Sequence, residues 1–346
     1  MVPRAGRNGV AVLALLLTAA AACDRQPAQQ ANVVRTDSAG VRIVTNTGPD
    51  TTLAWRFDTV GVLTDSLGEP WLFTSVPPHW VLTDRAGRTY VLDREPAIRR
   101  FARDGRYERS IGRRGAAPGE MDFPVALLQQ GDSIAVHEGQ RDQLVRWGPD
   151  LEPIGTQQLT GNFQGARKLA FRTGGVWIQR YRYDSASAYT ELYGDTSATE
   201  PIYRLAEQPP VMMQACGLRV GMAFPRFFAP TINWHNAGAR MLANLGPSYD
   251  LKLYEGPRLI AAIRRDLPPR APTVEDLAAT FPEGLVIPAA SGNCTIPVAD
   301  LMARVGVADT MPFVHGLTLL SDGTMWVQRS VRNQKPVVLD VFGSDG

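Results

Sequence analysis

A repeating unit of short strands and tight turns over residues 80–123 constrains the fold more than any other feature of the sequence. Two apolar segments within residues 81–93 lie on either side of a turn that begins at Asp84 and ends at Gly87. Two further strands are expected at residues 98–101 and 107–111, separated by an Asp-Gly turn. Four short antiparallel strands in about 45 residues are typical of one β-propeller blade.

The same plan recurs along the chain at the spacing of a blade. Tyr90 and Ile134 lie 44 residues apart, and Phe101 and Trp147 lie 46 apart. The second unit covers residues 126–159. A third is expected over residues 168–205, with a polar insert at 183–200, a degenerate fourth over 227–263 and a fifth over 314–342. Five repeat units can therefore be traced.

A segment of different character interrupts the repeats at about residues 265–312. Thr273 and Asp276 form a capping-box-like start for one helix. Val298, Leu301 and Val305, together with Met302, have helical spacing and predict a second helix with one apolar face. This helical insertion has two interpretations: a decoration that covers the last blades, or a lid over a ligand site.

The fifth repeat stops at its third strand, and the sequence ends at an Asp-Gly pair. Two alternatives follow: the propeller is truncated at its last blade, or N-terminal strands complete the ring. Apolar segments at residues 33–34, 41–44 and 53–57 are available to join the first and last blades by hydrogen bonds and to remove open sheet edges.

The repeats resemble the six-bladed β-propeller family of the NHL type, in particular its exported bacterial lipoprotein members. The resemblance implies an all-β fold with six blades, here in residues 32–346 with the helical insertion. It is strongest over residues 80–159 and 313–346. The motifs that carry it are Asp84-x-x-Gly87-x-x-Tyr90-Val91-x-Asp93, Phe101-x-x-Asp104-Gly105, the run from Ile111 to Glu120 with Phe123-Pro124, and Leu319-x-x-Asp322-Gly323-x-x-Trp326-Val327.

Two residue types have physical roles in such blades. Glycine adopts positive φ in the turns, and aspartate hydrogen-bonds the turn backbone. Large aromatic side chains fill the wedge between neighbouring blades, and we expect this of Tyr90, Phe101, Trp177 and Trp326.

The N-terminus has the features of a bacterial lipoprotein signal peptide. Arg4 and Arg7 precede an apolar run at residues 10–22, which is short for a membrane span and ends at Cys23. The Ala-Ala-Ala-Cys sequence at 20–23 resembles a lipobox. We expect residues 1–23 to be the signal peptide with Cys23 as the lipidated residue, and residues 24–31 to be a polar tether. The alternatives are ordinary secretion and an uncleaved anchor. The lipid on Cys23 would make the membrane a partner, and the choice between inner and outer membrane stays open.

The two other cysteines, Cys216 and Cys294, are available as one pair. An oxidising compartment would allow a disulfide between them. The alternative is two buried thiols.

Composition and motifs exclude several functions. The chain has 36 Lys and Arg residues against 34 Asp and Glu, which leaves a net charge of +2. This balance lacks the electrostatic footprint of a nucleic-acid-binding protein. No Gly-x-Ser-x-Gly elbow occurs, and the glycine-rich run at residues 112–120 lacks the Gly-Lys-Ser/Thr ending of a phosphate loop. We interpret this run as an interblade loop.

Two hypotheses for function remain, and a third is a purely structural envelope protein. The first, which we prefer, is an anchored propeller that binds an unknown protein partner or small ligand through loops on one face, with no catalytic step and no cofactor. Arg180, Tyr181, Arg182 and Tyr183 are its candidate rim residues. The second is a propeller lactonase or lyase with Ca²⁺ or Zn²⁺ on the axis, in which at least three of five candidate ligands would meet. These axial candidates are Asp93, His137, Glu138, Asn233 and His235.

Overall fold

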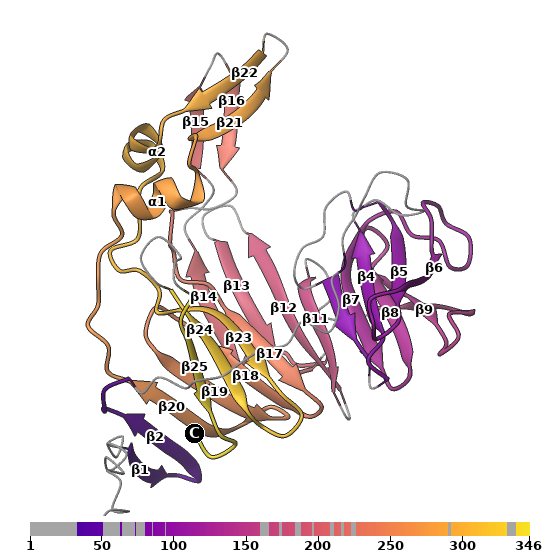
Figure 1. Ribbon diagram of the computed structural model, residues 1–346, viewed down its shortest axis with the longest axis horizontal. Helices are drawn as coiled ribbons and strands as arrows, with labels where there is room; N and C mark the ends of the chain where they lie inside the picture. The colour runs from indigo at the N-terminus through magenta and orange to yellow at the C-terminus, as the bar shows by residue number, and fades with distance from the viewer. Residues whose placement is uncertain are drawn as a thin grey trace, which may run out of the picture.

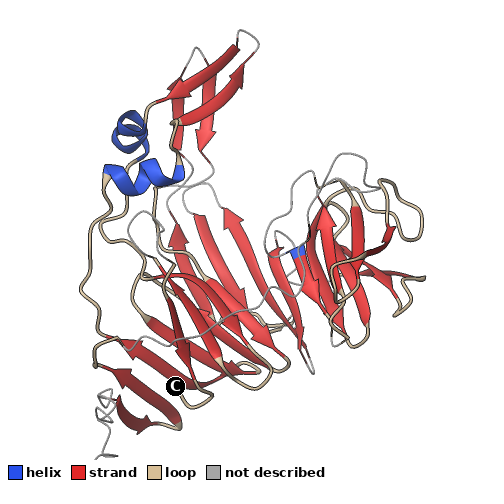
Figure 2. Cartoon of the chain, viewed as in Figure 1, coloured by secondary structure: helices blue, strands red, loops and turns tan. Residues whose placement is uncertain are grey.

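The computed structural model describes residues 33–50, 63, 73, 80–84, 86–93, 95–159, 166–172, 175–183, 188–195, 197–207, 211–215, 218–222, 226–289, 292–330 and 337–346. Strands dominate these residues, and two short helices accompany them (Figure 2). The chain is therefore all-β. Within the described ranges, no helix has both the length and the apolarity to cross a membrane.

The first two blades are four-stranded antiparallel sheets in which each strand pairs with the next one along the chain (Figure 1). The turn between the first two strands forms as expected. Asp84 Oδ1 accepts hydrogen bonds from the amides of Ala86 and Arg88, and Gly87 has a φ of +80°. The first blade comprises β3 (Val81–Thr83), β4 (Thr89–Asp93), β5 (Ala97–Phe101) and β6 (Tyr107–Ile111), and the second comprises β7 (Pro124–Gln130), β8 (Ser133–Glu138), β9 (Gln143–Trp147) and β10 (Pro153–Gln158).

The third and fourth blades follow the same order but depart from the expected boundaries. Residues 183–200 were expected to be a polar insert, yet they contain β13, because Ala188, Leu192 and Tyr193 are buried. The fourth blade is regular rather than degenerate. The third blade comprises β11 (Ala166–Arg172), β12 (Gly175–Tyr183), β13 (Ala188–Tyr193) and β14 (Tyr203–Glu207), and the fourth comprises β17 (Asn233–Ala237), β18 (Arg240–Asn244), β19 (Asp250–Glu255) and β20 (Arg258–Arg265).

The fifth blade has three strands, β23 (Val314–Leu319), β24 (Met325–Arg329) and β25 (Leu339–Phe342). The described residues thus form five blades, and the expectation of six, which came from the family resemblance, was wrong. The five repeats traced in the sequence correspond to these five sheets.

Closure of the ring by N-terminal strands was one of the two alternatives, and the first two of the three candidate segments pair differently, while residues 53–57 lie outside the described residues. β1 (Val33–Ser38) and β2 (Val41–Asn46) form a hairpin, and β2 pairs in parallel with β20 at the outer edge of the fourth blade. The physical reason is burial: Val44 is fully buried against Ile263 and Phe342 of the fourth and fifth blades. Arg42 Nη2 also donates to the carbonyl oxygen of Ser344, at 3.2 Å, so the C-terminal turn contacts the hairpin through a side chain.

The core consists of apolar clusters at the four junctions from the first blade to the fifth. Tyr90 packs with residues of the second blade, and Trp177 packs with residues of the fourth, as predicted. Phe101 is buried against the ring of Tyr107 in its own blade, with 5.8 Å between ring centroids. Trp326 is only half-buried.

The insertion contains both predicted helices, α1 (Val274–Thr280) and α2 (Val298–Val305). At the start of α1, Thr273 Oγ1 accepts a hydrogen bond from the Asp276 amide and the Asp276 carboxylate accepts one from the Thr273 amide. The insertion also includes a hairpin that we did not predict, β21 (Leu285–Ala289) with β22 (Gly292–Ile296). A second hairpin, β15 (Val211–Ala215) with β16 (Leu218–Met222), lies at the same end of the molecule (Figure 1).

The insertion has a small apolar core of its own. Leu277 of α1 and Leu301 of α2 are buried together with Phe227, which lies in the segment that leads into the fourth blade. This core shows that the insertion is a packed unit attached to the propeller through the segments at each of its ends. Figure 1 shows it beyond one end of the blade sheets.

Candidate functional site

The candidate site is a cavity of about 980 Å³ between the insertion and the last two blades. Its size falls within the range of small-molecule sites. One wall comes from α1, another from the segments that connect the insertion to the propeller, and the rest from β14, β17, β23 and β24. The lining residues include Leu205, Arg226, Phe227, Phe228, Thr231, Asn233, Leu277, Phe281, Asp309, Met311, Val314, His315, Gln328 and Arg329.

Two connecting segments are fixed to each other at the cavity. The Phe227 amide donates to the Gly306 carbonyl oxygen at 3.0 Å, and the Ala308 amide donates to the Phe227 carbonyl oxygen at 2.9 Å. The ring of Phe227 packs edge-on against Phe281, with 5.7 Å between centroids. These contacts hold an aromatic surface in place on the insertion side.

Phe228, which also lines the cavity, has a φ of +58°. A bulky side chain is uncommon in this left-handed region, and such strain is found most often at functional sites. The conformation directs the chain from the insertion core into the fourth blade.

Polar groups from the blades face the same cavity. Asn233 Nδ2, on β17, donates to Thr231 Oγ1 at 3.3 Å and to the Val314 carbonyl oxygen at 3.4 Å. His315 is exposed on β23, and Gln328 lies opposite Gly316 on β24. The cavity therefore combines apolar and aromatic walls with a few polar groups, which is the usual composition of a ligand site.

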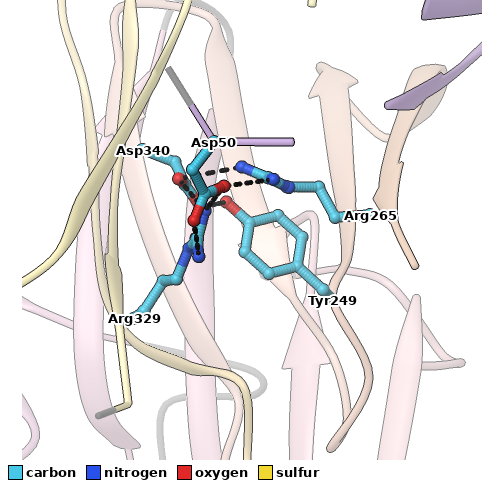
Figure 3. Close-up of polar contacts among 5 residues, drawn as sticks. All are labelled: Asp50, Tyr249, Arg265, Arg329 and Asp340. Carbon is cyan, nitrogen blue, oxygen red and sulfur yellow. Dashed lines mark hydrogen bonds and ion pairs between the residues drawn. The ribbon is translucent and has the colours of Figure 1, made fainter. Parts of the chain in front are cut away.

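Arg329 links the cavity to a network that joins distant segments (Figure 3). Its guanidinium contacts the carboxylates of Asp50, at 2.7 Å, and Asp340, at 2.5 Å. Arg265 also binds both carboxylates, at 2.5 and 3.0 Å, and Tyr249 donates to Asp340 Oδ2 at 2.6 Å. The network thereby connects the N-terminal segment, the fourth blade and the fifth blade.

The network has a clear electrostatic consequence. Hydrogen bonds from Arg329, with a further contribution from Arg265, lower the pKa of Asp50 to about 2. Burial and the neighbouring charge of Asp340 raise the pKa of the Tyr249 hydroxyl far above its ordinary value. Both groups therefore keep one protonation state over the physiological range: Asp50 is charged and Tyr249 is neutral.

The five axial candidates lie on the first or second strand of three different blades: Asp93 on β4, His137 and Glu138 on β8, and Asn233 and His235 on β17. Asp93 is buried and binds Arg99 at 3.0 Å within the first blade. Glu138 accepts hydrogen bonds from the Phe123 amide and from Arg141 in the second blade. Asn233 alone among the five lines the cavity. In the ranges described above, no three His, Cys, Asp or Glu side chains form a group that could hold a metal ion.

The two histidines among these candidates are largely buried. His137 Nε2 lies 3.6 Å from Asp142 Oδ1, beyond hydrogen-bond distance, and neither ring nitrogen has a hydrogen-bond partner among the described residues. Burial lowers the pKa of His137. His235 Nδ1 accepts a hydrogen bond from the Leu319 amide at 3.1 Å. Burial, followed by the charge of Lys168, lowers the pKa of His235. Both rings are therefore neutral at pH 7.

The rim candidates lie on β12, where their surroundings differ. Arg180 is half-buried and binds Glu191 at 2.9 Å, and Tyr181 lies under the Arg167 guanidinium at 6.0 Å. Arg182 is exposed. The backbone of Tyr183 is described as part of β12, but the side chain of Tyr183 is not described.

The cysteine and signal-peptide predictions fall mostly on undescribed parts of the chain. Cys294, on β22, is disulfide-bonded. Cys23, Cys216 and the whole segment 1–32 lie outside the described residues.

Sequence reasoning missed the cavity and the charge network that shares Arg329 with it. Phe227 and Phe228 were assigned to the start of a blade strand, and Asp50 and Asp340 were not singled out. No local pattern marks these residues, since their partners come from the other end of the chain. The only available signal was the helical insertion, for which a lid over a ligand site was one of two interpretations.

Comparisons with known proteins show similarity of fold alone. No family model matches the sequence, and no curated protein is significantly similar to it. Among solved structures, a Bacteroides fragilis protein described as exported aligns over 82% of this chain and 72% of its own, with 12% identity and a TM-score of 0.45. A Bacteroides caccae protein of unknown function aligns over 80% and 82%, with 11% identity and a TM-score of 0.37. Streptogramin B lyase aligns over 76% and 78%, with 10% identity and a TM-score of 0.33. Similarity at this level supports no conclusion about function. The succession of sheets makes the chain a β-propeller, with five blades in its described residues.

Proposed function

We propose that this protein is an exported, lipid-anchored β-propeller that binds an apolar small molecule in the cavity between its insertion and its last two blades. The cavity carries the proposal. Its volume of about 980 Å³ accommodates a drug-sized ligand, and aromatic residues form one wall.

The construction of the cavity supports a binding role. Apolar ligands gain free energy from leaving water, at about 25 cal/mol per Å² of buried surface. Phe227, Phe228 and Phe281 supply such a surface on the insertion side, and Asn233 and Gln328 supply hydrogen-bonding groups on the blade side. The fixed link between residues 227 and 306–308 preorganises the aromatic wall, which lowers the entropic cost of binding.

The anchor part of the proposal depends on the sequence. The basic residues, the apolar run and the Ala-Ala-Ala-Cys sequence before and at Cys23 support lipidation. Incorporation of radiolabelled palmitate into the wild-type chain, and its loss in Cys23→Ser, is the expected result. Equal labelling of both chains, or labelling of neither, would remove the anchor and leave the cavity proposal intact.

We make no proposal for a metal-dependent reaction. Arginines of the same blade pair with the carboxylates of Asp93 and Glu138, which are two of the five axial candidates. A carboxylate that is held by a guanidinium would have to give up that pair in order to bind a cation.

The binding proposal can be tested with an apolar fluorescent probe, 1-anilinonaphthalene-8-sulfonate, titrated against the folded protein. We expect saturable binding of one probe per chain. Ala229→Trp, which adds bulk at the cavity wall, should weaken binding at least tenfold. Ala303→Trp is the matched control, because Ala303 is exposed on α2 and is not a lining residue. Absence of saturable binding, or equal loss in both variants, would overturn the proposal.

A further inference from the structure

One charged residue of the cavity lining, Arg329, is held by carboxylates that are not part of the lining (Figure 3). Its Nε and Nη2 donate to Asp340 at 2.7 and 2.5 Å, and its Nη1 and Nη2 donate to Asp50 at 2.9 and 2.7 Å. These bonds use four of the five N–H groups of the guanidinium. Arg329 therefore borders the cavity with most of its hydrogen-bonding capacity already engaged.

The charges around Arg329 cancel. Arg265 binds the same two carboxylates, so the network contains two guanidinium groups and two carboxylates. The other charged residues of the described lining, Arg226 and Asp309, have opposite signs. The described wall of the cavity therefore has no net charge at pH 8, where histidine side chains are uncharged.

Asp50 and Asp340 differ in their place within the network. The Asp340 side chain is 9% exposed and also accepts a hydrogen bond from the Tyr249 hydroxyl, so Asp340 forms the centre of the network. The Asp50 side chain is 57% exposed, and it comes from the N-terminal segment that follows β2. Loss of the Asp50 charge would leave two guanidinium groups with one carboxylate, and the cavity wall would gain one positive charge.

We propose that Asp50 is a specificity-determining residue of the cavity: by neutralising Arg329, it makes the cavity selective for uncharged apolar ligands over anionic ones. This inference rests on the proposed binding function and specifies the class of ligand. Asp50 acts through Arg329, because Asp50 itself is not a lining residue. It is therefore a positioning residue, which holds the guanidinium and its charge away from the ligand.

The cost of moving a charge out of water explains why the ligand is uncharged. An anionic group that enters the cavity gives up hydration, and this loss is repaid only by a cation with free donors. Asp50 holds Arg329 in a bidentate pair, at 2.7 and 2.9 Å, so this repayment is already spent within the protein. An uncharged ligand has no such cost, and the aromatic wall of Phe227 and Phe281 binds its apolar surface.

The test compares two fluorescent probes that share one aromatic skeleton. N-phenyl-1-naphthylamine is uncharged, and 1-anilinonaphthalene-8-sulfonate differs from it by a sulfonate. At pH 8 and low salt, the wild-type chain should bind the uncharged probe about tenfold more tightly. In Asp50→Asn the affinity for the sulfonate probe should rise about fivefold, as expected for one added charge near a partly solvated site, and the affinity for the uncharged probe should stay the same. About 0.5 M salt should remove most of this gain.

Two further variants make the result decisive. Asp50→Glu keeps the negative charge and should restore the wild-type preference. Asp345→Asn is the matched control, because it also removes an exposed carboxylate, one that pairs with Arg35 instead of Arg329, and it should leave the ratio of the two affinities unchanged. An unchanged ratio in Asp50→Asn, or an equal change in Asp345→Asn, overturns the inference and leaves the binding proposal standing. Failure of the uncharged probe to bind the wild-type chain saturably would overturn the binding proposal itself.

Discussion

The first two blades and the last two blades bind their buried charges in different ways. In the first blade, Asp93 pairs with Arg99 of the adjacent strand, and in the second, Glu138 pairs with Arg141 three residues later. In the last two blades, Asp340 binds Arg265 and Arg329, and both arginines also bind Asp50 from the N-terminal segment.

The charge pairs of the first two blades are therefore local in the sequence, whereas those of the last two blades join segments that are far apart in the sequence. The charge pairs of the first two blades join residues of the same blade. In the fourth and fifth blades, in contrast, the charge network includes Asp50 of the N-terminal segment. The candidate ligand cavity borders this second region, and Arg329 belongs to both.

Asp340→Asn should produce the largest effect. The substitution removes the negative charge that faces two guanidinium groups and a tyrosine hydroxyl, and breaking a buried pair costs about 3–5 kcal/mol. Urea denaturation measures the loss. Hydrogen exchange should show lost protection in β1–β2, β20 and β25, far apart in the sequence.

Asp93→Asn is the matched control for Asp340→Asn, since it also removes a buried charge that an arginine holds. In Asp93→Asn, the loss of hydrogen-exchange protection should be confined to β3–β6. Loss of protection that spreads equally far in both variants would show that the two regions do not differ as we infer.

Asp50→Asn should have a smaller effect that depends on pH. The folded-state pKa of Asp50 lies below its unfolded value, so its contribution is complete above about pH 4 and is lost as the pH falls toward 2. We expect the variant to lower Tm by about 1–2 °C at pH 6, because the side chain is partly exposed, and the difference should shrink at pH 3. A Tm difference that is constant between pH 6 and pH 3 would contradict this account.

The exposed pair between Arg35 and Asp345 should contribute least. Their side chains are 49% and 66% exposed, and the charged atoms are 3.2 Å apart. A double-mutant cycle with Arg35→Met and Asp345→Asn should give a coupling free energy below about 0.5 kcal/mol in urea denaturation. A larger coupling would mean that the C-terminal turn fixes the N-terminal hairpin more firmly than the geometry indicates.

The parts of the fold that could be predicted from sequence are those set by local interactions. The turn at Asp84 and Gly87 depends on hydrogen bonds within a few residues, and it was predicted correctly. The cap of α1 at Thr273 and the apolar face of α2 were predicted for the same reason. The repeat spacing located the sheets, because each strand pairs with its neighbour in the chain.

The parts that could not be predicted depend on distant partners. β2 has a strand pattern, but nothing in its sequence indicates pairing with β20 rather than with the last blade. The number of blades was inferred from a family resemblance, and the described residues form five sheets rather than six. The cavity forms where Phe227 meets residues 306–308, a contact between segments about 80 residues apart that no periodicity encodes.

The attachment of β2 to β20 also sets an order of events during folding. Asp50 and Arg265, which close this junction, are separated by 215 positions, so the amino-terminal hairpin is synthesised long before its docking edge exists. Until then, β20 and the hairpin would each present unpaired backbone to other chains. The hairpin must therefore wait for β20 to be synthesised before it can dock, and that delayed step is where misassembly would begin.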